Sequence, residues 1–130
     1  MPKTETPEGR LNSGVYTLLI SLPRGVDLKI AGHSRKFKSG YYIYTGRAMR
    51  GLSQRLKRHL RTSDTVHWHV DHLLHQGKII DIQAEITDDP GRECGIAHEV
   101  GNWPGAEVVS EFGATDCSCT AHLAYLAQRP

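Results

Sequence analysis

Two tyrosines and an arginine stand at positions where they could handle a phosphate group. Tyr16 ends the triplet Gly14-Val15-Tyr16, Tyr44 begins the triplet Tyr44-Thr45-Gly46, and Arg55 follows nine residues after Gly46. Phenol hydroxyls bind water or phosphate oxygens, and a phenol whose pKa is lowered can accept a proton. A guanidinium matches a phosphate with two parallel hydrogen bonds and stays charged. Together these residue types indicate phosphodiester chemistry.

Charge is segregated along the chain in a way that suits this chemistry. Residues 24–61 hold eleven Lys/Arg and one acid, whereas residues 81–116 hold nine Asp/Glu and one Lys/Arg. A basic half attracts a polyanion, and carboxylates hold divalent cations. The alternative is that the two halves only keep the protein in solution. The cations that we expect to grip nucleic-acid backbone are Arg47, Arg50, Lys57 and Arg58.

Short elements must position these residues. The patterns predict strands at 14–22, 26–31, 37–45, 78–87, 107–112 and 120–127, and helices at 52–61, 66–76 and 92–100. Tight turns between the first three strands favour an antiparallel meander. The leucines of residues 52–60 recur every four positions, as on an amphipathic helix. The fold class is therefore α/β or α+β, with a small antiparallel sheet and few helices.

A chain of 130 residues suits one domain. Residues 1–12 are rich in Thr, Glu and Pro and are expected to form a flexible tail. The polar beginning of the chain and the lack of a long apolar run predict a soluble, cytoplasmic protein with no membrane partner. Three cysteines exclude a complete disulfide framework within the chain.

Three motifs, in this order, resemble the GIY-YIG nuclease signature. They are Gly14-Val15-Tyr16, then Tyr44-Thr45-Gly46-Arg47-Ala48, then Leu52-x-x-Arg55-Leu56-x-x-x-Leu60. That superfamily includes the N-terminal nuclease of a DNA-repair excinuclease and several homing endonucleases. The segments 67–71, 93–94 and 112–123 resemble its narrower Uri-type branch. The resemblance runs from about residue 13 to 126, which makes residues 13–130 a single GIY-YIG-like domain.

The resemblance implies a metal-dependent endonuclease that hydrolyses DNA phosphodiester bonds. Its fold would be a three-stranded antiparallel central sheet flanked by helices, with extra C-terminal strands. Its cofactor would be one Mg²⁺ or Mn²⁺, and a partner protein would supply targeting. Carried over residue by residue, Tyr16 is the general base, Tyr44 orients water or phosphate, Arg55 clamps the phosphate, His59 contacts phosphate or serves as an alternative base, and Glu93, or else Glu99, ligates the metal.

This sequence departs from the family pattern at two points. Valine and threonine replace the central isoleucine of each triplet, and 27 residues separate Tyr16 from Tyr44. The long separation implies an extended hairpin around Pro23–Lys38.

Other interpretations accompany each candidate. Tyr16 and Tyr44 could be ordinary strand aromatics that pack across the sheet. The whole domain could be a nucleic-acid-binding module that grips phosphates without cleavage, or a zinc-stabilised interaction domain.

The histidines and cysteines have two interpretations as well. His67, Asp71 and His75 recur at helical spacing and could bind a metal, although a structural hydrogen-bonded cluster with Trp68 and His69 is favoured. Cys117, Cys119 and His122, with Cys94, could form a zinc site. The alternative is that these cysteines are small buried hydrophobic residues.

Overall fold

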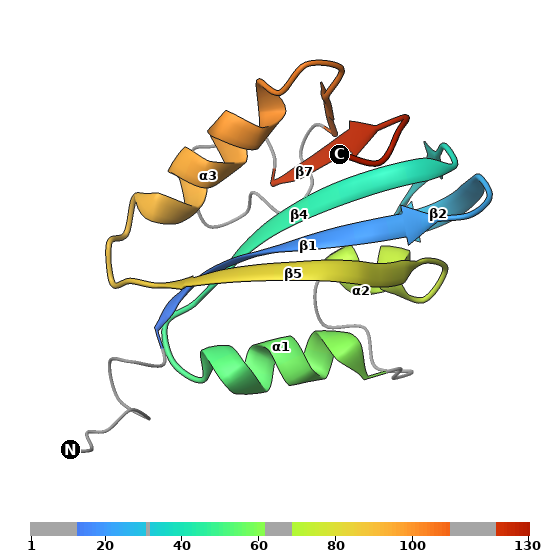
Figure 1. Ribbon diagram of the computed structural model, residues 1–130. Helices are drawn as coiled ribbons and strands as arrows, with labels where there is room; N and C mark the ends of the chain where they lie inside the picture. Colours follow the sequence, from blue (N-terminus) through green and yellow to red (C-terminus); the bar gives the residue numbers. More distant parts are fainter. Residues whose placement is uncertain (1–12, 31, 62–68, 110–121) are drawn as a thin grey trace.

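The computed structural model describes residues 13–30, 32–61, 69–109 and 122–130. Figure 1 shows a twisted sheet with α3 over one face and with α1 and α2 under the other. The strands are β1 (Gly14–Leu22), β2 (Val26–Ile30), β3 (His33–Phe37), β4 (Gly40–Ala48), β5 (Lys78–Ile86), β6 (Glu107–Val108) and β7 (Leu123–Leu126). The helices are α1 (Leu52–Leu60), α2 (His69–Leu74) and α3 (Arg92–Gly101).

The main sheet has five strands in the order β5-β1-β4-β7-β6, and every neighbouring pair is antiparallel. The mixed α+β class is thus confirmed, whereas the central sheet has five strands instead of three, because β7 and β6 extend the same sheet. Strands β2 and β3 form a separate two-stranded sheet.

The predicted meander is wrong at its second strand. Residues 26–30 pair with residues 33–37, and β1 pairs instead with β4 and β5. The predicted strand 37–45 is two strands, β3 and β4, separated at residues 38–39. Gly40 follows this break with a φ of 143°, a conformation that favours glycine.

Side chains along β1 point alternately to the two faces of the sheet, and a separate hydrophobic cluster lies on each face. The larger one lies on the α1 and α2 side, where Tyr16, Leu18, Ile20 and Leu22 pack with Val70 and Leu73. The smaller one lies under α3 and contains Ile43, Val100, Ala124 and Leu126. The sheet therefore presents a different set of side chains to each layer. In the described ranges, every helix is too short or too polar to traverse a lipid bilayer.

Candidate active site

Tyr16 and Tyr44 point to the same side of the sheet from neighbouring strands. Tyr16 lies opposite Gly46 in the β1–β4 pairing, and the centroids of the two tyrosine rings are 6.3 Å apart. A Cβ atom at position 46 would lie 2.5 Å from the Tyr16 hydroxyl oxygen. Glycine at this position is thus what allows the Tyr16 ring to lie across β4.

His59 completes a cluster of three rings. It lies in the last turn of α1, and its ring centroid is 5.4 Å from that of Tyr16 and 6.2 Å from that of Tyr44. The Tyr16 hydroxyl oxygen is 2.8 Å from Nε2 of His59, so these two groups share a hydrogen bond. Only 4% of His59 is exposed, so the ring is buried beside the Tyr16 hydroxyl.

Burial decides the protonation of these groups. Burial lowers the pKa of His59 to about 4, although the Asp71 carboxylate acts in the opposite direction. Burial raises the pKa of Tyr16 to about 12, partly offset by the Arg55 guanidinium, and it also raises the pKa of Tyr44. At neutral pH both phenols are therefore protonated and the imidazole is neutral. A neutral imidazole can accept the Tyr16 proton at Nε2.

Arg55 lies beside both phenols, one turn into α1. Its Nη1 donates a hydrogen bond of 3.0 Å to the backbone oxygen of Arg47, which links α1 to the end of β4. Its positive charge lowers the pKa of Tyr16 and of Tyr44 against the effect of burial. The side chain is only partly buried, so it can meet a ligand.

Glu93 comes from the opposite layer, in the first turn of α3. The turn before α3 is held by Asp89, whose Oδ1 accepts a hydrogen bond from the backbone N–H of Gly91. Arg92 donates two hydrogen bonds to Glu85 and so fixes the start of α3 against β5. The negative charge of Glu93 raises the pKa of Tyr16 and of Tyr44, which places it within electrostatic reach of both.

Both carboxylate oxygens of Glu93 have basic neighbours. Oε2 lies 3.1 Å from Nδ1 of His122, and Oε1 lies 3.9 Å from Nε of Arg47. The carboxylate keeps 15% of its surface exposed. Carboxylate oxygens are the ligands that Mg²⁺ and Mn²⁺ prefer, and Mg²⁺ often takes only one or two of them besides water and substrate phosphate. Glu93 fits such a site, with His122 positioned to orient it.

Glu99, the other metal-ligand candidate, faces a different region. It is exposed and lines a pocket of about 420 Å³ between α3 and strands β1 and β5, together with Tyr16, Arg92 and Trp103. The electrostatic effects on Tyr16 and Tyr44 include Glu93 and not Glu99. Of the two acids, Glu93 is thus the one that acts on both phenols, although Glu99 shares a pocket with Tyr16.

The four cations expected to bind backbone phosphates differ in their surroundings. Arg50 and Lys57 are exposed. Arg47 reaches toward Glu93 and donates to the backbone oxygen of Pro90 at 3.4 Å. Arg58 lies against the buried carboxylate of Asp71, with Nη2 at 3.4 Å from Oδ2. Arg50 and Lys57 are thus the two best placed for an approaching polyanion.

Two further residues contact this site in ways that no local sequence pattern signals. His122 lies against Glu93, and Asp71 lies against Arg58 and acts on the pKa of His59. The proximity of His122 to Glu93 arises because β7 pairs with β4, a pairing that no local pattern signals. His67, Trp68, Cys117 and Cys119 lie outside the described residues, as does the side chain of His69. Those cluster hypotheses stay predictions.

Cys94 bears on the zinc hypothesis. Its Sγ lies 3.9 Å from Nε2 of His122, so these two candidate ligands are neighbours. Cys94 is disulfide-bonded in this structure, and a disulfide sulfur is not the thiolate that zinc binds. A zinc site that uses Cys94 would therefore require the reduced form. Within the described ranges, no group of three or more His, Cys, Asp or Glu side chains is arranged to hold an ion.

The fold and this cluster define an α+β domain with a polar, largely buried site between α1 and α3. A family model, described as a domain of unknown function (DUF123), matches residues 15–130. The chain therefore belongs to the DUF123 family. Neither the curated proteins nor the solved structures contain a significant match.

Proposed function

We propose that this domain is a divalent-metal-dependent endonuclease of the GIY-YIG type that hydrolyses DNA phosphodiester bonds. The observation that carries the proposal is the hydrogen bond between the Tyr16 hydroxyl and Nε2 of His59, beside Arg55. This hydrogen bond couples Tyr16, which ends the Gly14-Val15-Tyr16 motif, to the neutral imidazole of His59. His59 lies on α1, the helix that also carries Arg55. A purely structural pair of strand aromatics does not need a titratable partner.

The reaction proceeds by attack of water on the scissile phosphorus. As the new P–O bond forms, the water proton passes to the Tyr16 oxygen and the Tyr16 proton passes to Nε2 of His59. The bond from phosphorus to the 3′-oxygen then breaks, the leaving 3′-oxygen takes a proton from solvent water, and His59 returns its proton to solvent by way of Tyr16. Because the pKa of Tyr16 is about 12, the phenol is protonated at neutral pH and can take the water proton only as its own proton passes to His59. Burial makes the His59 imidazole a weak base, so the negative charge of the bound phosphate has to stabilise the imidazolium that forms.

Arg55 and Tyr44 act on the phosphate. The Arg55 guanidinium stabilises the charge that builds on the phosphate oxygens in the transition state, and the Tyr44 hydroxyl orients water or phosphate. A Mg²⁺ or Mn²⁺ ion held by Glu93 would stabilise the leaving 3′-oxygen. The His122 ring lies against the Glu93 carboxylate, with Nδ1 at 3.1 Å from Oε2.

One observation favours a second candidate function, a nucleic-acid-binding module without cleavage. Tyr16 is 2% exposed and Tyr44 is 7% exposed, whereas the Arg55 and Glu93 side chains keep more contact with solvent. In such a module the rings would serve packing, and the exposed cations Arg50 and Lys57 would bind backbone phosphates.

Nicking of supercoiled plasmid separates the two candidates. The endonuclease requires Mg²⁺-dependent nicking that the chelator EDTA abolishes and that Arg55→Ala lowers by about 10²–10³-fold. Arg61→Ala is the matched control, because Arg61 is an exposed arginine at the C-terminal cap of the same helix and should change nicking by less than about threefold. Retention of DNA without any nicking would support the binding module and contradict the endonuclease.

A further inference from the structure

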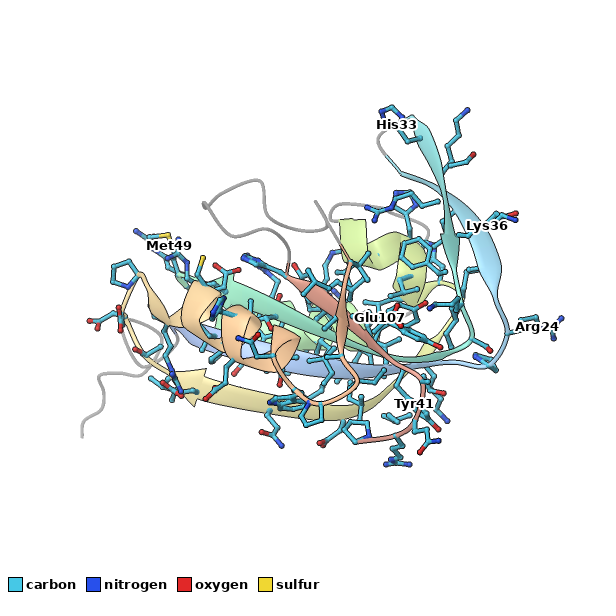
Figure 2. The ribbon with its side chains drawn as sticks, turned by 90° about the horizontal axis from the view of Figure 1, so that it is seen from above. Arg24, His33, Lys36, Tyr41, Met49 and Glu107 are labelled. Atoms are coloured by element: carbon cyan, nitrogen blue, oxygen red, sulfur yellow. The ribbon has the colours of Figure 1, made fainter. Side chains whose placement is uncertain are left out.

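The β2–β3 hairpin extends away from the main sheet. Figure 2 shows it projecting outward, with His33 near its tip, Lys36 along its length and Arg24 at its base. Two strands alone are marginally stable in water, so such a hairpin needs support from the rest of the protein. The five paired residues of each strand span ~17 Å.

The two faces of the hairpin differ in character. On the inner face Val26, Leu28 and Phe37 pack against the main core, and β2 contacts α2. On the outer face the paired residues Asp27 with Lys36 and Lys29 with Ser34 are all exposed. The inner face therefore anchors the hairpin, and the outer face is left for a partner.

The outer face carries two cations, Lys29 and Lys36, and one acid, Asp27, which lies opposite Lys36. Residues 24–38 contain five Lys/Arg and one acid, Asp27. Lys38 is paired with Glu107 at 3.0 Å, and Arg35 lies over the Phe37 ring at 6.0 Å. The remaining cations, Arg24, Lys29 and Lys36, are exposed, and no carboxylate of the described residues forms an ion pair with them.

We propose that the β2–β3 hairpin is a second DNA-binding element, which enters the major groove of the duplex that flanks the phosphate bound at Arg55. The inference rests on the proposed function, because it takes DNA as the substrate. The major groove of B-form DNA admits a two-stranded ribbon, and Lys29 and Lys36 then reach backbone phosphates. The major groove of duplex RNA is too narrow for such a ribbon, so the element favours DNA.

The test is the salt dependence of binding to a 30-base-pair DNA duplex by the full chain. The double variant Lys29→Gln/Lys36→Gln removes two cations from the outer face. The matched control Lys78→Gln/Arg129→Gln removes two exposed cations elsewhere. Since each phosphate contact contributes about 0.9 to the slope of log K against log salt, the hairpin variant should lower that slope by about 2. The control should leave it unchanged.

Cleavage measured in the same samples separates the two proposals. The hairpin variant should keep the single-turnover nicking rate of DNA-saturated enzyme, because it does not touch the site at Tyr16. A lowered slope without nicking by any sample would uphold the hairpin element and contradict the endonuclease. Normal nicking with equal slopes in both variants would overturn the hairpin element alone. Equal slope changes on duplex RNA, or wild-type protein that binds acidic polypeptide but not DNA, would overturn it as well.

Discussion

Two pairs of tyrosines on the same face of the same sheet have opposite surroundings. At the hairpin end, Tyr42 donates its hydroxyl to the backbone oxygen of Lys38 at 2.7 Å, and Tyr125 donates to that of Ser39 at 2.8 Å. At the other end, the Tyr16 hydroxyl meets the imidazole of His59. The first pair holds the chain between β3 and β4, and the second pair faces groups that can take a proton.

The hydrogen-bond partner of each phenol distinguishes the two ends of the sheet better than the pKa of the phenol does. Burial raises the pKa of Tyr42 as it does that of Tyr16 and Tyr44, so a raised pKa is common to both ends. A backbone oxygen cannot accept a proton during a reaction, whereas a neutral imidazole can. The end of the sheet at which we propose catalysis is thus marked by His59, Arg55 and Glu93.

The largest effect should come from removing the metal ligand. Glu93→Gln keeps the shape of the side chain but loses its charge, and we expect Mg²⁺-dependent plasmid nicking to fall by at least about 10³-fold. Glu99→Gln is the matched control on the same helix and should stay within about threefold. Equal losses in both variants, or an unaffected Glu93 variant, would contradict the assignment of Glu93.

Removing single hydroxyls should separate the two ends of the sheet. Tyr16→Phe loses the proton path, so nicking should fall by about 10²–10⁴-fold. Tyr42→Phe leaves the Lys38 backbone oxygen without its donor, so it should lower the free energy of unfolding by about 1 kcal/mol and leave nicking within about twofold. Plasmid nicking and urea unfolding measure the two effects. Similar nicking losses in Tyr16→Phe and Tyr42→Phe would contradict the proposal that the two ends of the sheet have different roles.

A methyl group at Gly46 should disturb the Tyr16 end of the sheet alone. The added Cβ meets the Tyr16 ring at 2.5 Å, so Gly46→Ala displaces the ring and should lower the free energy of unfolding by about 1–3 kcal/mol, with a loss of nicking. Gly95→Ala is the control in α3, where a Cβ meets no other group within 4 Å. It should stabilise the helix by up to ~1 kcal/mol. An unchanged melting temperature for Gly46→Ala would contradict this packing.

The smallest effect concerns pH and His59. An unfolded histidine titrates near pH 6.5, whereas burial lowers the pKa of His59 to about 4. Between these values the unfolded chain binds the extra proton, so stability is complete above about pH 6.5 and is lost as the pH falls toward 4. From pH 7.5 to 5 the loss should be about 2 kcal/mol in urea unfolding.

The variant His59→Gln should remove this part of the pH dependence. His98→Gln is the control, because His98 is exposed on α3. If the wild-type protein and His59→Gln lose stability in parallel on acidification, His59 is not buried in its neutral form.

Local pattern predicted much of the fold. The strand at 14–22 and the helices at 52–61 and 92–100 are confirmed within a residue or two, because their periodicity and their turn residues agree. Pairing was not predictable in the same way. The alternation of residues 26–30 indicates a strand but does not say which strand lies beside it, and the chain turns back onto residues 33–37 instead of onto β1.

Only the site residues that belong to a sequence motif could be predicted from the sequence. Tyr16, Tyr44 and Arg55 lie together as their spacing suggested, and Glu93 joins them because Asp89 and Arg92 fix the start of α3. The hydrogen bond from Tyr16 to His59 could not be foreseen, since it depends on how α1 packs under β1. The proximity of His122 to Glu93 depends on β7, which lies nearly thirty positions further along the chain.

The most direct test of the account is a double-mutant cycle in plasmid nicking with Tyr16→Phe, His59→Gln and the combined variant. If the two residues form one proton path, the combined variant should nick about as fast as the slower single variant, because the path is already broken. Multiplied losses would show that the two residues act independently. A cycle in which neither single variant slows nicking, or a wild-type protein that does not nick DNA with Mg²⁺, would contradict the proposed mechanism.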